Sequence, residues 1–271
     1  MSAPVIRIFS DLHYRDSESR LQSLDSLVPL LAAADQIVLN GDTLDTQPPA
    51  PVAHLADVRA FFARHAGPVT FLSGNHDPDV SDRAELSILD GRVWITHGDV
   101  LFDDIAPWSS HRAELARRLA ILSLDPSSDE CGRIETRLRL NRLACLNLPE
   151  PHDRSHRGLT TRVARMTHTL FPPHRLLAMV RAWCATPALA RRLAGEQRPR
   201  ARLVVLGHTH HPGVWHDRAS GVTVVNTGTF CPPFGARFVE LQGDRVRVVR
   251  IVWRRGAFHP GRIVAEFPLA P

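Results

Sequence analysis

The apolar residues of the first hundred positions follow two alternating patterns. Short runs rich in branched side chains are typical of buried strands, and they occupy 5–9, 37–39, 69–72 and 92–96. Longer stretches with apolar residues three or four positions apart are typical of amphipathic helices, and they cover 20–33 and 52–65. Strands that alternate with helices predict an α/β fold with a layered sheet.

The pattern changes after Trp108, and strand-like runs return only at 202–206, 222–226, 237–241 and 245–253. Between them, helical spacing gives three apolar faces, and Pro172, Pro173 and Pro187 predict helix breaks. The faces are Leu115, Leu119 and Leu122; Val163, Met166 and Leu170; and Leu176, Val180 and Trp183. We therefore predict a core of 1–108 and 203–271 that is interrupted by a helical cap insertion, 109–202.

The composition is that of a globular protein, with 271 residues, 44% hydrophobic and 23% charged. These shares are near the average, which excludes disordered and fibrous chains. The four cysteines form no C-x-x-C pair, so a zinc ribbon and a thioredoxin motif are excluded. The first residues lack the pattern of a secretory signal, and no stretch has the roughly 18 apolar residues of a spanning helix. We expect a cytoplasmic protein.

Basic charge is concentrated in the insertion. Its 94 residues hold 18 arginines against 8 acids, whereas the rest of the chain holds 15 arginines against 20 acids. Such a segment attracts anionic partners, but arginine is also a good helix former on solvated faces. Both interpretations stay open for Arg112, Arg117, Arg118, Arg133, Arg137, Arg139, Arg142, Arg154 and Arg157.

Five polar clusters each follow a predicted strand directly. Ligands of α/β sheets bind beyond the carboxyl ends of the strands, so we expect these clusters to converge. They are Ser10-Asp11-Leu12-His13, Asn40-Gly41-Asp42, Ser73-Gly74-Asn75-His76-Asp77, His97-Gly98-Asp99 and Gly207-His208-Thr209-His210.

Seven oxygen or nitrogen donors in these clusters suit metal ions. They are Asp11, His13, Asp42, Asn75, His97, His208 and His210. Alternate residues of an extended segment share one side, so Asp-x-His and His-x-His can each reach one ion. Seven donors exceed the tetrahedral set of one zinc and suit two divalent ions that share a carboxylate. Mixed imidazole and carboxylate ligation favours manganese, iron or zinc over magnesium or calcium. Any single cluster is common as a turn, so the prediction rests on their conjunction.

The order of these clusters resembles that of the calcineurin-like metallophosphoesterase superfamily. The resemblance covers 1–108 and about 203–230, and it implies an αββα sandwich of two mixed sheets flanked by helices. It also implies that Asp11, His13, Asp42 and His210 hold one ion, and that Asp42 bridges to a second ion. Asn75, His97 and His208 would complete the second site, and Asn226-Thr227-Gly228-Thr229 would be structural.

The resemblance further implies the reaction. A hydroxide that bridges the two ions attacks phosphorus and cleaves a phosphoester or pyrophosphate bond. His76 is expected to protonate the leaving group, with Asp77 as the residue that orients it. Two divalent ions, most simply manganese, are the expected cofactors.

The 111 positions between His97 and His208 resemble the insertion of bacterial UDP-2,3-diacylglucosamine pyrophosphatases, as does the stretch 97–104. Those enzymes have arginine where this chain has His76, so their activity is an alternative. A nuclease of the same superfamily is another, and a non-catalytic scaffold is a third, which the retention of all seven donors disfavours.

The expected partner is a phosphate-containing small-molecule or lipid-linked substrate, and the insertion could contact a membrane surface. Nucleic acid is not expected, because the insertion has one Trp and one Phe and offers few stacking platforms.

Overall fold

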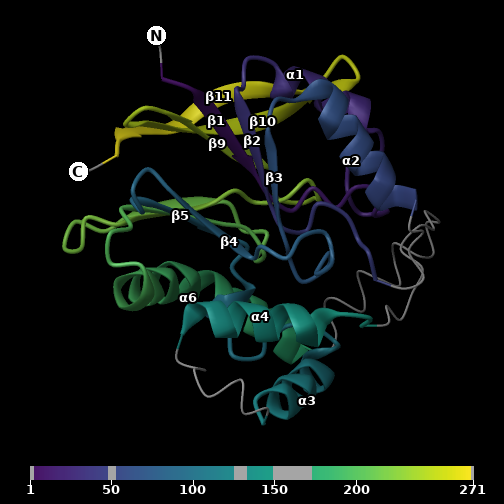
Figure 1. The fold of residues 1–271 in the computed structure, drawn as a ribbon, viewed down its shortest axis with the longest axis vertical. Helices are drawn as coiled ribbons and strands as arrows, with labels where there is room; N and C mark the ends of the chain where they lie inside the picture. Colours follow the sequence, from purple (N-terminus) through teal and green to yellow (C-terminus); the bar gives the residue numbers. More distant parts are fainter. Residues whose placement is uncertain (1–2, 48–52, 125–132, 149–172, 270–271) are drawn as a thin grey trace.

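Two β-sheets packed face to face, with helices on both outer sides, form the fold in a computed structural model (Figure 1). The structure describes residues 3–47, 53–124, 133–148 and 173–269. Helices α1 and α2 cover the first sheet, and α4 and α6 cover the second. The predicted αββα sandwich is confirmed.

The first sheet has the strand order β11-β10-β9-β1-β2-β3. Strands β1, β2 and β3 are parallel, whereas β9, β10 and β11 pair antiparallel. Their bounds are Val5–Phe9 for β1, Gln36–Asn40 for β2, Val69–Leu72 for β3, Arg237–Gln242 for β9, Arg245–Arg254 for β10 and Ala257–Pro268 for β11.

The second sheet has the order β4-β5-β6-β8-β7. Parallel β5, β6 and β8 form its centre, and β4 and β7 pair antiparallel at its edges. The bounds are Glu85–Ile88 for β4, Val93–Thr96 for β5, Leu203–Leu206 for β6, Gly213–His216 for β7 and Thr223–Asn226 for β8.

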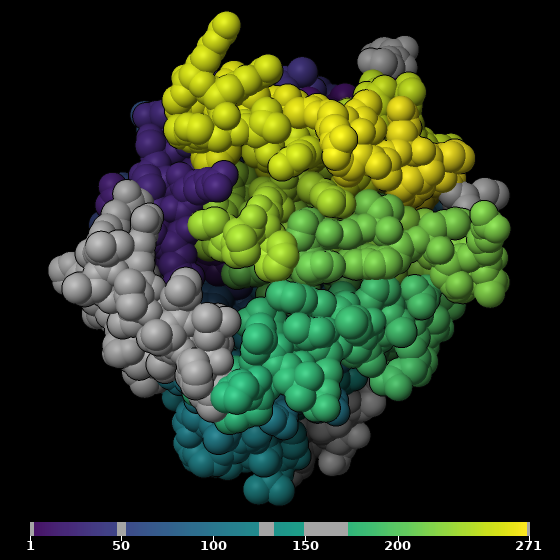
Figure 2. Space-filling view, turned by 180° about the vertical axis from the view of Figure 1, so that it is seen from behind, coloured from purple at the N-terminus to yellow at the C-terminus, as the bar shows by residue number. Residues whose placement is uncertain are grey.

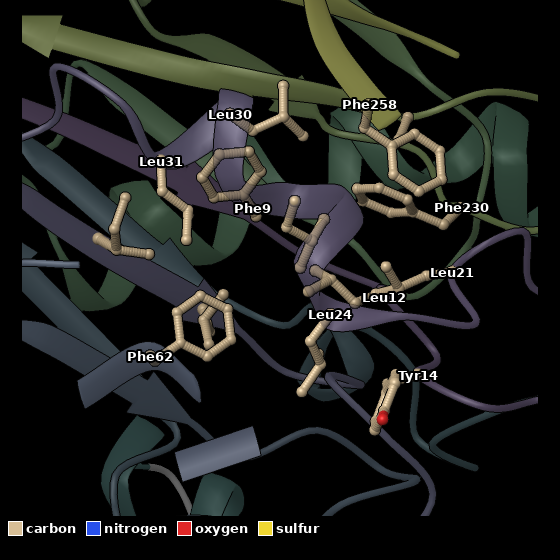
Figure 3. Packing of buried hydrophobic residues seen from close by; sticks show 14 of the residues in the cluster. Phe9, Leu12, Tyr14, Leu21, Leu24, Leu30, Leu31, Phe62, Phe230 and Phe258 are labelled. Atoms are coloured by element: carbon tan, nitrogen blue, oxygen red, sulfur yellow. The ribbon is translucent and has the colours of Figure 1, made fainter. Parts of the chain in front are cut away.

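The central strands are mainly apolar, and both of their faces are buried. Successive side chains of a strand point to opposite sides, so Ile8 lies between the sheets while Phe9 packs beneath the helices of the first sheet. Figure 3 shows Phe9 beside Leu30 and Leu31 of that outer layer. Continuous apolar runs are typical of such doubly covered strands.

Helix α2 (Ala53–His65) forms where it was predicted, but the helix predicted over 20–33 is wrong. The segment contains a 3₁₀ turn at Leu24–Leu27 and the single helical turn α1 (Val28–Leu31), and Ala33 has a positive φ of 64°. Pro29 lacks an amide hydrogen, so it is tolerated in the first turn of a helix and not in its interior. The spaced leucines are buried all the same.

The insertion forms helices α3 (Arg112–Leu122), α4 (Ile134–Cys145) and α6 (Pro173–Gln197) among its described residues. Side chains of α4 and α6, such as Leu138 and Leu193, share one apolar cluster with Trp94 and Val204 of the second sheet. Figure 2 shows α6, in green, directly against the lighter green strands of the second sheet. The insertion is therefore packed on the core. The apolar face predicted at Val163, Met166 and Leu170 lies outside the described residues.

The structure corrects two expectations for α6. Pro187 does not end the helix: it is buried inside it, one residue after Thr186, whose hydroxyl donates to the Ala182 carbonyl at 2.7 Å. A proline removes one backbone hydrogen bond, which burial against the core offsets here. Leu176 and Val180 do not form a buried face, because each is 40% exposed.

Strands β4, β7 and β11 were not predicted. The last contains Pro260 and Gly261 and lies at the edge of its sheet, where a missing amide hydrogen costs little. No helix in the described parts of the chain is long and apolar enough to cross a bilayer.

Candidate metal centre and active site

The carboxyl ends of five parallel strands meet at one edge of the sandwich, and the seven predicted donors follow them. Asp11 and His13 follow β1, Asp42 follows β2, and Asn75 follows β3. His97 follows β5, and His208 and His210 follow β6. All except Asn75 and His210 are fully buried.

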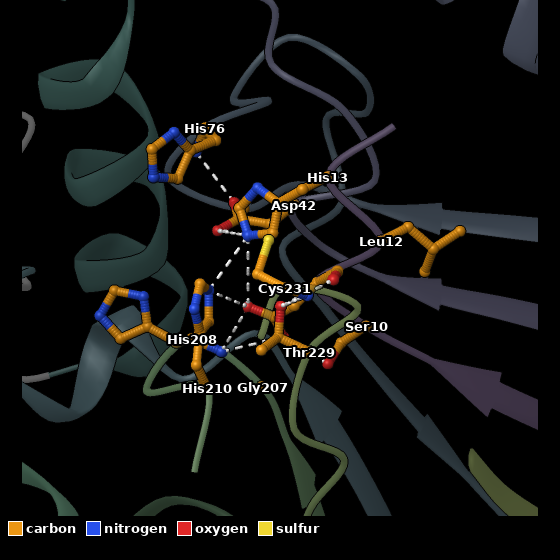
Figure 4. Close-up of polar contacts among 12 residues, drawn as sticks. Ser10, Leu12, His13, Asp42, His76, Gly207, His208, His210, Thr229 and Cys231 are labelled. Carbon is orange, nitrogen blue, oxygen red and sulfur yellow. Dashed lines mark hydrogen bonds and ion pairs between the residues drawn. The ribbon is translucent and has the colours of Figure 1, made fainter. Parts of the chain in front are cut away.

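One group of donors has its ligand atoms within 4.8 Å of one another, namely Asp11, His13, Asp42 and His210. The Nε2 atoms of His13 and His210 are 3.0 Å apart, and Nε2 of His210 is 3.2 Å from Oδ1 of Asp11. Figure 4 shows the rings of His13 and His210 close together, with the His13 ring beside Asp42. Buried carboxylates and imidazole nitrogens that converge in this way are the donors of a divalent-ion site.

A second group adjoins the first through Asp42. Nε2 of His97 lies 3.2 Å from Oδ2 of Asp42 and 3.2 Å from Oδ1 of Asn75. The ring of His208 is 5.1 Å from that of His97. Asp42 therefore has donors on both sides, as a carboxylate shared by two ions requires.

Hydrogen bonds to backbone carbonyls fix which nitrogen of two histidines is available. Nδ1 of His97 donates to the Asn40 carbonyl at 3.0 Å, so Nε2 is the ring nitrogen that faces Asp42. Nε2 of His208 donates to the Ile105 carbonyl at 2.9 Å, which leaves Nδ1 free to bind. Metal-binding histidines are oriented by such bonds in the same way, so these residues fit a metal centre.

The charges of the site also suit metal binding. Burial lowers the pKa of His13 and of His208 to about 4, so both are neutral near pH 7 and can donate a lone pair. Burial opposes ionisation of Asp42, but His97 and His76 outweigh it and hold the pKa of Asp42 well below its usual value. Asp42 is thus an anion, the form that binds cations.

Five of the seven donors have a left-handed backbone. The φ angles are 51° for Asp11, 47° for His13, 51° for Asp42, 65° for His208 and 59° for His210. Residues with a side chain seldom adopt this conformation, and such strain concentrates at functional sites. The strain therefore marks the same positions as the donors do.

Motif glycines allow the loops to approach each other. A Cβ atom on Gly207 would overlap Oδ2 of Asp11, and one on Gly74 would overlap Oδ1 of Asp42. The amide of His208, next to Gly207, donates to Oδ1 of Asp11 at 3.0 Å. The glycines thus bring ligand-bearing loops from different strands into contact.

The sequence profile of the calcineurin-like phosphoesterases, Metallophos, matches residues 4–212, which span all seven donors. The chain belongs to this family.

The solved structures that are similar to this chain have low sequence identity to it. Vacuolar protein sorting 29 of Cryptosporidium parvum is 14% identical, with a TM-score of 0.46, over 99% of this chain and 100% of that one. A dimetal phosphatase from Danio rerio is 14% identical, with a TM-score of 0.48, over 99% of each chain. Vps29 of Chaetomium thermophilum is 10% identical, with a TM-score of 0.49, over 98% of this chain and 99% of that one. No curated protein sequence matches the chain.

His76, the expected general acid, lies at the rim of the donor cluster. Its backbone amide donates to Oδ1 of Asp42 at 2.9 Å, and Nδ1 of its ring is 3.6 Å from Oδ2 of Asp45. Asp45 was missed in the sequence, where its signal is a second acid three residues after Asp42. Asp45 therefore presents a carboxylate to the ring of His76.

Asp77 has a different task from the one predicted. Its Oδ1 accepts hydrogen bonds from the amides of Asp42 and Gly74 at 2.9 and 2.8 Å, and its Oδ2 accepts one from Thr43 at 2.7 Å. Burial and the charge of Asp42 raise the pKa of Asp77 to about 8. The prediction that Asp77 orients His76 is corrected: its oxygens bind backbone amides and join the loops after β2 and β3.

The stretch 226–229 is structural, as expected. Nδ2 of Asn226 donates to the Gly207 carbonyl at 2.6 Å, and its Oδ1 accepts from the amide of Gly228 at 2.9 Å. The hydroxyl of Thr229 donates to the Asp11 carbonyl at 3.2 Å. These bonds hold two ligand-bearing loops in place.

The insertion is bonded to the loops that carry the site. Nε1 of Trp183 donates to the Thr209 carbonyl at 2.9 Å, between the two histidines of the last motif. Nδ2 of Asn141 donates to Asp99 at 2.9 Å, two residues after His97. Helices α4 and α6 are thus anchored at the metal centre as well as on the second sheet.

Proposed function

We propose that the chain is a metal-dependent phosphohydrolase that cleaves a phosphoester or pyrophosphate bond. The observation that supports this proposal most strongly is the convergence of the seven donors beside His76, with Asp42 between the two groups. Asp11, His13, Asp42 and His210 would hold one ion, and Asp42, Asn75, His97 and His208 the other. Divalent ions bound there would lower the pKa of a coordinated water and neutralise charge on phosphate oxygens.

The residues of the chain supply the remaining chemistry. His76 lies beside the donor cluster and is half-buried, so its ring can donate a proton to the oxygen that leaves phosphorus. Asp45 faces Nδ1 of that ring at 3.6 Å and can orient it with Nε2 toward the substrate. The amide of His76 holds Oδ1 of Asp42, which ties the position of the acid to that of the shared ligand.

Metal content together with activity tests this proposal. The purified protein reconstituted with manganese should hold two ions per chain and hydrolyse p-nitrophenyl esters. Asp42→Asn should lose both ions and most of the activity, because one carboxylate serves both groups. Asp99→Asn is a matched control, since Asp99 is also buried but bonds to Asn141. One ion or none in the wild-type protein, or full activity in Asp42→Asn, would contradict the proposal.

Finer assignments are tested by the choice of metal and substrate. We propose manganese as the metal, with iron and zinc as alternatives. We also propose that the enzyme is cytoplasmic. A nucleotide-sugar pyrophosphate and single-stranded DNA, added to the substrate panel, separate a UDP-2,3-diacylglucosamine pyrophosphatase-like activity and a nuclease from other phosphohydrolases. A nuclease would also show a steep salt dependence of DNA affinity.

A further inference from the structure

A cavity of about 330 Å³ lies over the donor cluster, with Asp42, Asn75, His76, His208 and His210 among its lining residues. The rest of the described lining is mainly apolar and comes from 106–108, from the insertion and from the loop after β8, together with Glu18, Gln47 and Thr209. Its largest apolar members are Trp108, Leu115, Leu148, Met179, Trp183 and Phe234. A group attached to a phosphate at the donors would therefore lie against apolar side chains.

The aromatic part of this wall is held in position before any ligand arrives. The hydrogen bond from Trp183 to the Thr209 carbonyl, 2.9 Å long, fixes the indole, and its ring meets that of Phe234 edge to face at 5.2 Å. Trp108 packs at 5.1 Å from the ring of His208. Preformed apolar walls favour binding because little side-chain freedom is lost.

The charges near the cavity do not favour a second anionic group. Glu18 is the charged side chain that lines it besides Asp42 and the histidines, among the described residues. Several arginines of the insertion bind the protein itself: Arg142 donates to the Pro78 carbonyl at 2.7 Å, and Arg118 donates to the Leu146 carbonyl at 2.7 Å. The described wall thus offers apolar contact beside the polar side chains of Ser109, Ser110 and His111, and no arginine for another phosphate.

We propose that the organic group of the substrate is uncharged and apolar, an aryl group of one or two rings, and that it packs against the wall of Trp183 and Phe234. The inference rests on the proposed function, because the phosphate is placed at the donor cluster. The volume is near the lower end of the range of ligand sites, about 300–1,000 Å³, which suits a group of that size.

Calorimetry on the full-length, manganese-loaded protein tests the inference with non-hydrolysable phosphonates. 1-Naphthylmethylphosphonate should bind at least about tenfold more tightly than methylphosphonate, since burial of the rings removes apolar area from water. Phosphonoacetate, which carries a second charge, should bind no more tightly than methylphosphonate.

Two aromatic variants make the test specific. Phe234→Ala should lower the naphthylmethyl preference about threefold or more and leave the affinity for methylphosphonate unchanged. Trp253→Ala is the matched control, because Trp253 is also an exposed aromatic residue, at 50% against 39% for Phe234, but does not line this cavity. It should leave the preference unchanged.

The outcomes separate this inference from the proposed function. Equal affinities for the naphthylmethyl and methyl compounds, tighter binding of phosphonoacetate, or an unchanged preference in Phe234→Ala would overturn the inference. If manganese-dependent hydrolysis of p-nitrophenyl esters is then observed, the proposed function still stands. Absence of both hydrolysis and phosphonate binding would overturn both.

Discussion

The role of an individual residue in the site depends on the residues that surround it in the structure. Asp45 and Asp77 lie three residues after Asp42 and one residue after His76, and from the sequence alone Asp77 was the expected partner of His76. In the structure the carboxylate of Asp77 accepts hydrogen bonds from three backbone amides. By contrast, Oδ2 of Asp45 lies 3.6 Å from Nδ1 of His76. A buried carboxylate must be satisfied by donors, and for Asp77 the amides of its own and the adjacent loop supply them.

This arrangement predicts the effect of Asp45→Asn. The variant should keep both ions, because Asp45 is not among the donors, but it should lose about tenfold or more in rate on esters with poor leaving groups. General acid catalysis contributes about 10²–10⁴-fold, and a misplaced His76 would lose part of that. Rates for phenyl and p-nitrophenyl esters measure the effect, which should be smaller for p-nitrophenol because that group leaves with less protonation.

The comparison with His76→Ala decides whether Asp45 acts through His76. If the two residues act together, the double variant with Asp45→Asn and His76→Ala should lose little more rate than His76→Ala alone. Independent, additive losses, or loss of metal in Asp45→Asn, would contradict the positioning role.

Among the elements, α6 has two halves with different environments. Its first half presents Leu176, Leu177 and Val180, which are 40–48% exposed, whereas Leu193 in the second half is 7% exposed in the cluster that joins α6 to the second sheet. Between them, Pro187 is tolerated because the second half is fixed by packing. Helical stability in proteins comes mostly from such packing.

Leu193→Ala should therefore lower the free energy of unfolding by about 2–4 kcal/mol, as expected for a leucine removed from a packed core. Leu176→Ala, the same substitution in the same helix, should change it by less than about 1 kcal/mol because its side chain is exposed. Urea denaturation of the two variants measures the difference. Equal losses would show that the second half of α6 is not part of the core.

At the scale of the whole molecule, the insertion supplies the outer helical layer of the second sheet. Trp94, Val204 and Val224 of that sheet are fully buried in a cluster that includes α4 and α6. The sequence boundaries at 109 and 202 separate the insertion from the core along the chain, but the two share one apolar cluster in space. An αββα sandwich requires a helical layer on each sheet, and here the insertion forms one of them.

Replacement of 109–200 by a short linker should therefore abolish cooperative folding, since it exposes an apolar sheet face to water. Expression as aggregates, or a thermal scan without a cooperative transition, is the expected result. A soluble deletant that unfolds cooperatively and holds two manganese ions would show that the insertion is a separable cap.

The resemblance of the motifs to the calcineurin-like superfamily implied the sandwich of two sheets. The sequence by itself determined the α/β layering, the converging donors and their order. Each depends on local information: apolar runs specify strands that are buried on both faces, and the residues directly after parallel strands must meet at one edge. Arg142, by contrast, could not be assigned from the sequence, because either solvation or a phosphate clamp was compatible with it. Its bond to the Pro78 carbonyl depends on the packing of α4 against the core.

The tertiary structure alone decided the partner of His76, the available nitrogens of His97 and His208, the pairing of β11 and the place of the insertion. These features depend on groups far apart in sequence: His208 is oriented by the carbonyl of Ile105, 103 residues earlier. Contacts of this kind are fixed when separate elements pack together, and no local pattern of polar and apolar residues encodes them. The motifs thus determine which donor side chains are present, and the packing of the elements determines how these side chains are arranged.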